Sequence, residues 1–448
     1  MSTGFGAGGK VTDPWAEGLQ INQLKFYEAG KPDEKMFKAL KDNIRLPESS
    51  LGDLRGQIAA CKLAERRFVE LLERYGKESV FSSINIIFDQ TEQRCRNVVK
   101  TFKSGTYEAD SFLDDDFLEK GNPVPIKVKV IINESDMTID LSECSKQRPG
   151  PINSRTFAAP RVAYKCLTDP FGPINEGSFR ALDIVLPEGN VMMAQFPAVM
   201  ASWSAVIPLV IDTIFKALDS AIEGKIPAAH KGVMGGAAVF HGYNPKTKRR
   251  FVANSTQGAG WGGRPFEDGP SSSVTVCQGD VRNSPIEKME LKFPIIIESR
   301  GLREDSAGPG KYRGGFGQTT RVRNLVEGMW NLESERRRNC PPWGLRGGKA
   351  GKPCSNMMLE AGEWKKDVDV TLYKVPANTV VLHETSGGGG WGDPLERDPA
   401  KVQWDVIEGL VSQEEARDAY GVVLNSDLSV DMRATEDLRS ELRKKSRA

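Results

Sequence analysis

Two glycine runs, each containing a tryptophan, are the first segments whose composition suggests chemistry. Residues 258–263 read GAGWGG and residues 387–394 read GGGGWGDP. Because glycine lacks a Cβ atom, consecutive glycines let several backbone amides converge on an anion, although they also form tight turns. Neither run matches the P-loop pattern, and no amphipathic helix follows the first, as a dinucleotide-binding motif requires. We therefore expect turns locked by a packed indole, the second placed directly before the C-terminal helices.

The first run is the better candidate for a binding site because polar residues flank it. Gln257 precedes the run and Arg264 follows it, so an amide and a guanidinium group stand beside backbone that a ligand can approach closely. The predicted substrate contacts in this run are Gln257, Gly258, Gly260 and Arg264.

Three consecutive arginines, residues 336–338, precede a turn stiffened by two prolines. A guanidinium group can bind a phosphate or a carboxylate through two N–H groups. If the segment is a strand, only Arg336 and Arg338 share a face, so these two are candidate anion contacts. A row of exposed or interface-pairing arginines is the alternative. Asn153, directly after the PGPI turn, is a further candidate substrate contact.

Other reactive side chains have simpler explanations. Ser142, Cys144 and Ser145 have no histidine near them in sequence, which a serine or cysteine nucleophile needs, so turn chemistry explains them better. The acidic run at 112–117 is expected to be a solvated loop. His230 and His241 lie eleven residues apart, where no helix face unites them, so each is expected to be tautomer-fixed or solvated. The residues themselves assign no catalytic group and predict no metal site.

Composition excludes several classes of function. The chain has 448 residues, 39% of them hydrophobic, and a formal charge of +1, so a globular protein is expected, without affinity for nucleic acid or anionic membranes. The most apolar stretch, residues 196–218, is interrupted by prolines and polar residues, which favours a core helix over a membrane span. Seven scattered cysteines and an N-terminus without an apolar signal core predict a cytoplasmic protein with reduced thiols.

The elements that must position these residues form a mixed α/β chain. A helix is predicted over 50–76, capped by Ser50 and ended by Gly76, and its apolar stripe is expected to be buried in the core. Alternation on either side of the NES turn at 133–135 predicts a half-exposed β-hairpin. We expect a mostly helical segment, a mixed α/β segment, a β-rich segment with long Gly-rich loops, and a C-terminal helical tail. Their ranges are 1–120, 121–231, 232–394 and 395–448.

Six long segments, in order and with similar spacing, resemble the hydantoinase B/oxoprolinase family. These segments are residues 51–76, 150–154, 173–192, 299–317, 334–348 and 387–399. The family includes B subunits of ATP-dependent hydantoinases, oxoprolinases and caprolactamase, and related subunits of biotin-independent acetone and acetophenone carboxylases. The resemblance extends over nearly the whole chain.

The resemblance implies a hetero-oligomer with a hydantoinase A-type ATPase subunit. That partner would bind ATP and Mg²⁺ and phosphorylate a cyclic amide or an enolised carbonyl, and the B-type subunit would receive the activated species. Two reactions remain open: hydrolysis of a hydantoin, oxoproline or other lactam, and carboxylation of a ketone. The competing class is a non-catalytic scaffold that shapes the reaction chamber.

Two departures from the family pattern limit these expectations. Members usually begin with an Asp/His metal site, whereas this chain opens at a point that corresponds to the middle of such a subunit. The resemblance thus implies that Zn, Mn or Fe is held by a separate chain, such as a small subunit that supplies this portion, or that the site is lost. Hydrolases also show Gly-Asn followed closely by Glu where this chain has Ser202, Trp203 and Ser204, which shifts weight toward carboxylation of a more apolar substrate.

Overall fold

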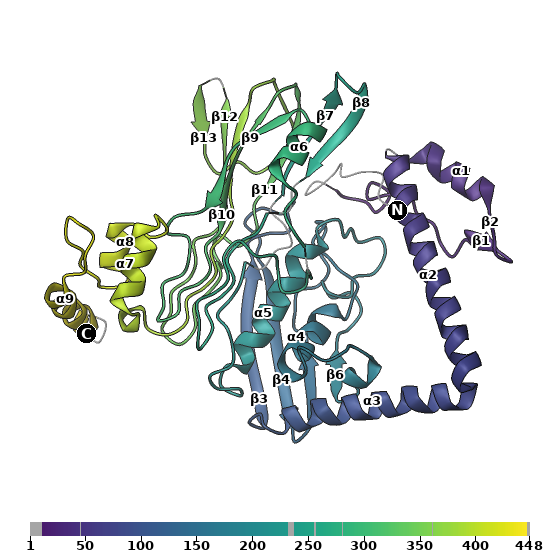
Figure 1. Cartoon of the computed structure of the whole chain (residues 1–448), viewed down its shortest axis with the longest axis horizontal. Coiled ribbons are helices and arrows are strands. Elements are labelled where there is room, and N and C mark those ends of the chain that lie inside the picture. The colour runs from purple at the N-terminus through teal and green to yellow at the C-terminus, as the bar shows by residue number, and fades with distance from the viewer. Residues whose placement is uncertain are drawn as a thin grey trace.

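The computed structural model describes residues 11–44, 46–231, 237–254, 257–279, 281–360 and 362–445. The chain is a mixed α/β protein with helices at both ends and a β-rich half between them (Figure 1), which confirms the predicted fold class. Within the described ranges, no helix is both long enough and apolar enough to cross a membrane.

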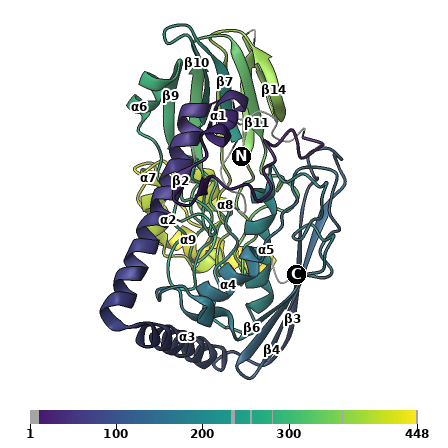
Figure 2. The same cartoon turned by 90° about the vertical axis from the view of Figure 1, so that its right-hand side faces the viewer.

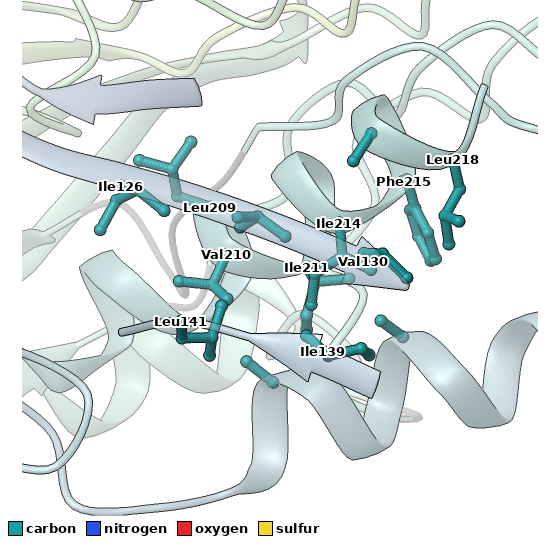
Figure 3. Close-up of a cluster of buried hydrophobic side chains, with 14 of the residues drawn as sticks. Ile126, Val130, Ile139, Leu141, Leu209, Val210, Ile211, Ile214, Phe215 and Leu218 are labelled. Carbon is teal, nitrogen blue, oxygen red and sulfur yellow. The ribbon is translucent and has the colours of Figure 1, made fainter. Parts of the chain in front are cut away.

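One sheet and the helices on it form the core of the first half. Its strand order is β3-β4-β5-β6, and the predicted hairpin is confirmed as β4 and β5. Alternate residues of β4 are buried, which leaves its other face toward solvent. Helix α5 packs on the buried face, where Ile126 and Val130 meet Leu209 and Ile214 (Figure 3); each such side chain stabilises the fold by about 1.5–3 kcal/mol. The bounds are β3 Gly105–Leu113, β4 Val124–Asn133, β5 Asp136–Asp140, β6 Leu182–Val185, α4 Ala158–Thr168 and α5 Val206–Leu218.

Two further sheets share a second hydrophobic core. Phe240 and Trp330 on one sheet and Ile297 and Val381 on the other belong to one cluster of buried side chains, so the two sheets form a sandwich. Their strand orders are β13-β12-β15-β10-β9 and β14-β11-β7-β8. The bounds are β7 Ala237–Asn244, β8 Arg249–Asn254, α6 Ile286–Lys292, β9 Ile295–Leu302, β10 Gln318–Asn324, β11 Gly328–Glu333, β12 Ser355–Glu360, β13 Glu363–Lys365, β14 Val370–Val375 and β15 Val380–Glu384.

Extended glycine-rich segments run side by side between the sandwich and the helical parts (Figure 1). We call this set the glycine bundle, and it consists of residues 226–231, 257–263, 268–273, 306–317, 342–352 and 386–392. Both tryptophan-containing runs belong to it, so the prediction that they are turns is wrong. The packed indole is confirmed for Trp391, whose Nε1 donates to the Ile226 carbonyl at 3.1 Å.

The hydrogen bonds of residues 387–391, in the last segment of the bundle, repeat every three residues. The amides of Gly387 and Gly390 donate to the 342–352 segment, those of Gly388 and Trp391 to the 306–317 segment, and that of Gly389 to Ala229. A chain with three residues per turn presents its amides in three directions, as polyproline II does, and it is crowded on every side. A Cβ atom on Gly388 would lie 1.9 Å from the Trp261 carbonyl oxygen, so only glycine permits this approach.

Helix α2 beyond its first turns and the start of α3 form an arm that stands away from the body of the molecule (Figure 2), whereas the end of α3 is buried at Cys95 and Val99. Large apolar side chains along the arm are 39–52% exposed, among them Phe68, Leu71 and Tyr75. The prediction that this stripe is core is therefore wrong beyond Ile58, because the helix leaves the domain whose surface covers its first turns. The start at Ser50 is also wrong, but the stop at Gly76 is confirmed. The bounds are β1 Tyr27–Glu28, β2 Lys31–Pro32, α1 Glu34–Asn43, α2 Pro47–Tyr75 and α3 Lys77–Val99.

The C-terminal tail is helical, as predicted, and its first helical stretch is divided into two short helices, 399–407 and 413–418. Gly409 has a φ of +68°, and Ser412 then caps a new helix by accepting a hydrogen bond from the Glu415 amide at 3.0 Å. The tail has its own small core around Val402 and Tyr420. The bounds are α7 Pro399–Ile407, α8 Gln413–Asp418 and α9 Met432–Lys445.

Candidate functional site

A cavity of about 600 Å³ opens beside the first glycine run. The indole Nε1 of Trp261 donates a hydrogen bond to the carbonyl of Val274, in the segment that pairs with the glycine run at Ala259 and Ser273. The lining mixes apolar, amide and hydroxyl groups and suits a small molecule with both polar and apolar parts. The lining residues are Gly258, Trp261, Ser272, Ser273, Val274, Thr275, Val276, Gln278, Gly279, Val281, Arg282 and Asn283.

The bundle places His230 directly beside Trp261. Segment 226–231 is hydrogen-bonded along the glycine run, from the Ala228 amide to the Gly263 carbonyl at 2.9 Å and from the Lys231 amide to the Gly260 carbonyl at 3.2 Å. The His230 ring therefore meets the Trp261 ring edge-on, with centroids 5.8 Å apart. His230 is 5% exposed.

His230 is fixed by a carboxylate and an arginine. Its Nδ1 hydrogen-bonds the Asp212 carboxylate, which projects from α5, and its backbone amide donates to the same carboxylate at 3.2 Å. Arg337 Nη1 lies 3.7 Å from Asp212 and donates to the His230 carbonyl at 3.0 Å. Because a carboxylate accepts, Nδ1 is the donor in this hydrogen bond, which leaves Nε2 as the second ring nitrogen. Within the described ranges Nε2 has no hydrogen-bond partner.

Lys231, the next residue, enters a second buried polar region. Its Nζ donates to the Gln257 carbonyl at 2.8 Å. Complete burial lowers the pKa of Lys231, and the nearby Glu335 carboxylate acts in the opposite direction. Glu335 is also buried, and neither of its carboxylate oxygens has a hydrogen-bond partner among the described residues. An ammonium and a carboxylate thus lie near one another behind the first glycine run.

Three of the seven predicted substrate contacts lie at the cavity or beside Lys231. Gly258 lines the cavity, the carbonyl of Gly260 accepts a hydrogen bond from the Lys231 amide, and the carbonyl of Gln257 accepts one from Lys231 Nζ. The Gly260 amide donates to Ser386 and so serves the bundle. Arg264 lies at the surface in an ion pair with Glu267.

Two predicted contacts have structural partners elsewhere. Asn153 is fully buried: its Oδ1 accepts the Arg148 amide at 2.7 Å, and its Nδ2 donates to backbone carbonyls, including that of Val199 at 2.9 Å. Asn153 thereby ties two loops together. Arg338 is exposed, and its guanidinium donates to Asp367 at 2.8 Å.

Arg336 is buried and paired, which makes it a structural residue. Its guanidinium donates to both carboxylate oxygens of Asp369, at 2.6 and 2.8 Å, and lies 4.1 Å from the centre of the Phe117 ring. Asp115, in the predicted solvated acidic run, is buried and lies 3.4 Å from Arg336. The prediction of a solvated run is therefore wrong, because Asp115 and Asp116 are buried and Asp115 pairs with Arg336.

Asp369 is expected to make stability depend on pH. Burial opposes its ionisation, but Arg336 and Lys120 outweigh burial and hold the pKa of Asp369 below its usual value. A carboxyl group whose pKa is lower in the folded state stabilises the fold at pH values above its unfolded-state pKa, which is about 3.9. This stabilisation is lost as the pH falls through the folded-state pKa. The difference in unfolding free energy between the wild type and Asp369→Asn should therefore shrink below about pH 4. Denaturant unfolding across this range measures it, and a constant difference would contradict the assignment.

Comparison with known proteins places the chain among its relatives. A family model described as hydantoinase B/oxoprolinase matches residues 5–394. The chain belongs to this family. It is 30% identical to the B subunit of a putative D-/L-hydantoinase from Pseudomonas sp. (strain NS671), covering 96% of this chain and 74% of that one. It is 26% identical to the acetophenone carboxylase delta subunit of Aromatoleum aromaticum, over 96% of this chain and 69% of that one.

A solved family structure has the same fold. The crystal structure of ATP-dependent caprolactamase from Pseudomonas jessenii superposes with a TM-score of 0.88 at 26% identity, covering 97% of this chain and 78% of that one. Relatives of this chain are thus subunits both of enzymes named for cyclic amides and of a ketone carboxylase.

The metal that the family resemblance implies does not fit the side chains seen here. Within the described ranges, no three His, Cys, Asp or Glu side chains lie together in a way that could hold a metal ion. His230 and Asp212, one nitrogen and one carboxylate ligand type, already bond to each other.

Sequence reasoning missed the residues that surround the glycine run. Arg337 was assigned to the opposite face from the two arginines chosen, yet it reaches His230 and Asp212. Asp212 is an acidic residue within an otherwise apolar helix, and this was the one signal that pointed to a buried partner. Trp203, in the segment that departs from the hydrolase pattern, is 41% exposed and does not line the cavity.

Proposed function

We propose that this chain is the B-type subunit of a hetero-oligomeric ATP-dependent enzyme and works with a hydantoinase A-type ATPase subunit. The observation that carries the proposal is the similarity over 97% of the chain to a caprolactamase described as ATP-dependent. The relative named as the B subunit of a hydantoinase supports the same division of the enzyme into separate chains.

The hydrogen bonds that the glycine amides form support assigning ATP and Mg²⁺ to the partner subunit. The amides of Gly260 and Gly263 and those of 387–391 donate to carbonyls inside the glycine bundle. A phosphate cradle needs such amides to point at the ligand. These glycine runs therefore serve packing, and the nucleotide chemistry is assigned to the A-type subunit.

The substrate would be a small cyclic amide or ketone whose carbonyl the partner has phosphorylated. Trp261 and Val276 give the cavity apolar walls, and Gln278 and Asn283 give it amide groups, a combination that accepts the ring and the polar edge of such a molecule. Relatives named for hydantoin and caprolactam favour hydrolysis, and the acetophenone carboxylase subunit favours carboxylation. A transition metal, Zn, Mn or Fe, would be held by a separate chain, such as a small subunit.

A second candidate function is that of a scaffold, and the exposed arm favours it. Apolar side chains 39–52% exposed along α2 and α3 are typical of a surface that another chain covers. In this role the chain would shape the reaction chamber while its partners perform the chemistry. We place the complex in the cytoplasm because all seven cysteines are free.

Co-expression with the A-type subunit tests the proposal. The purified complex is expected to hydrolyse ATP only when a substrate is present, and the substrates to compare are hydantoin, 5-oxoproline and caprolactam, and acetone and acetophenone with bicarbonate. A ring-opened product identifies hydrolysis, and a labelled carboxylate identifies carboxylation. The chain alone is the control and should show neither activity. A stable monomer that binds no ATPase subunit would contradict the proposal.

A further inference from the structure

A buried nitrogen without a hydrogen-bond partner lies beside the cavity. Asp212 bonds Nδ1 of His230 and Arg337 bonds its carbonyl, so Nε2 is the ring nitrogen left over. Leaving a buried polar atom without a partner costs free energy. Since Nε2 has none among the described residues, a molecule that supplies a proton or a hydrogen bond would recover that free energy.

We infer that His230, oriented by Asp212, accepts a proton from the water or the ketone that reacts in the Trp261 cavity. This role rests on the proposed function, in which the substrate is a cyclic amide or ketone activated by phosphorylation. The arrangement is that of a general base: an acceptor nitrogen, and a carboxylate on the other nitrogen that fixes the tautomer.

The transfer is balanced without any further reactant. In hydrolysis an O–H bond of the attacking water breaks while its oxygen bonds the activated carbonyl carbon, and in carboxylation a C–H bond next to the ketone carbonyl breaks and its electron pair forms the enolate. In both cases the proton binds Nε2. The imidazolium that forms is stabilised by the Asp212 carboxylate. The charged and titratable groups that face the pair are Arg337, 3.7 Å from Asp212, and Cys277 and Lys231 nearby. The Arg337 guanidinium lies beside the Asp212 carboxylate and compensates its negative charge.

Trp261 forms the wall between His230 and the cavity. Its ring contacts His230 edge-on and its indole N–H donates to the Val274 carbonyl. Cys277, whose thiol is near Asp212, bonds Thr275 in the same wall at 3.3 Å. The pair therefore lies behind Trp261, which lines the cavity, and the inferred proton transfer requires the indole to move aside from Nε2.

His230→Asn is the decisive variant because it separates two roles of the ring. The asparagine amide occupies the position of Nδ1 and keeps the hydrogen bond to Asp212, but it has no counterpart of Nε2. Product formation by the complex is expected to fall by about 10²-fold or more, with the melting temperature and assembly unchanged. Asp212→Asn should also lower product formation and shift the acidic limb of its pH profile. Unchanged product formation in a folded His230→Asn complex would overturn the inference.

His383→Asn is the matched control. His383 is also buried in β15, its Nδ1 bonds the Asn356 side chain, and its Nε2 has no partner among the described residues. Burial lowers the pKa of His383 to about 3, so it is neutral at working pH. Its side chain bonds Asn356 in β12, whereas that of His230 bonds Asp212 and contacts Trp261, so its replacement should leave product formation close to the wild-type value. An equal loss in both variants would assign a structural role to His230.

A chemical probe tests the position of Nε2 without any substrate. Diethylpyrocarbonate modifies neutral imidazole nitrogens that it can reach, and peptide mass spectrometry locates the product. Modification of His230 well before His383 is expected in the folded chain, because the ring of His230 contacts Trp261, which lines the cavity. If His230 reacts no faster than His383, the inference fails even where the complex turns over. If His230 reacts faster but no substrate is consumed by the wild-type complex, the proposed function fails instead.

Discussion

A chain in which alanine replaces Gly388 is expected to lose about 3 kcal/mol or more of unfolding free energy and to accumulate as insoluble protein. The added Cβ would lie 1.9 Å from the Trp261 carbonyl oxygen, and both sides of the contact are backbone. The Gly388 amide also donates to Gly315 at 3.0 Å. Because neighbouring segments surround Gly388, no side chain can rotate to make room, and the bundle itself must open.

Gly52→Ala provides the control for this experiment. Gly52 lies inside α2, and no atom lies within 4 Å of an added Cβ, so alanine should stabilise the helix by about 1 kcal/mol. Denaturant unfolding of both variants and the soluble fraction of each measure the difference. A Gly388→Ala protein that unfolds at the wild-type midpoint would show that the segments do not pack this closely.

Arg337→Met is expected to cost about 3–5 kcal/mol, the usual effect of removing one partner from a buried charge pair. Arg337 is nearly inaccessible and donates to the carbonyls of His230 and Cys340 at 3.0 Å. It also lies 3.7 Å from Asp212. Methionine preserves much of the volume but leaves Asp212 with His230 alone, so the loss measures charge compensation more than packing.

Two further variants make the Arg337 result specific. Arg338→Met changes the neighbouring arginine, which is exposed and paired with Asp367, and should cost less than about 1 kcal/mol. The double variant Arg337→Met with Asp212→Asn removes both charges and should recover part of the loss. If the double variant is destabilised by the sum of the single effects, Arg337 and Asp212 are not coupled.

Local sequence patterns predicted the elements whose burial depends on residues nearby in the sequence. The alternation in β4 and β5 predicted the hairpin and its exposed face, and Gly76 predicted the end of α2. The apolar stripe of α2 predicted a helix but misplaced its surroundings, because periodicity shows that a face is apolar and does not show what covers it. The arm presents that face to solvent in this chain.

Three residues chosen around the first glycine run lie beside the cavity or Lys231. Gly258 and Gly260 were chosen for close approach of a ligand and Gln257 as a polar flank, and their role as substrate contacts stays a prediction. The bundle itself was not predicted, because glycine-rich segments have no hydrophobic periodicity and the segments they bond lie far away in sequence. Arg336 and Arg337 were misassigned because Arg336 has a φ of +54°, which breaks the strand alternation on which the assignment depended.

The glycine bundle also governs when the chain can finish folding. The Trp391 indole bonds a carbonyl 165 positions earlier, and closing such a loop costs entropy before any contact is gained. Glycine adds to that cost because it loses more conformational freedom than other residues. During synthesis, the two hydrophobic cores have most of their residues available before 387–391 emerge from the ribosome. The bundle therefore closes after these two cores, and a nascent chain released early would display rows of unpaired amides.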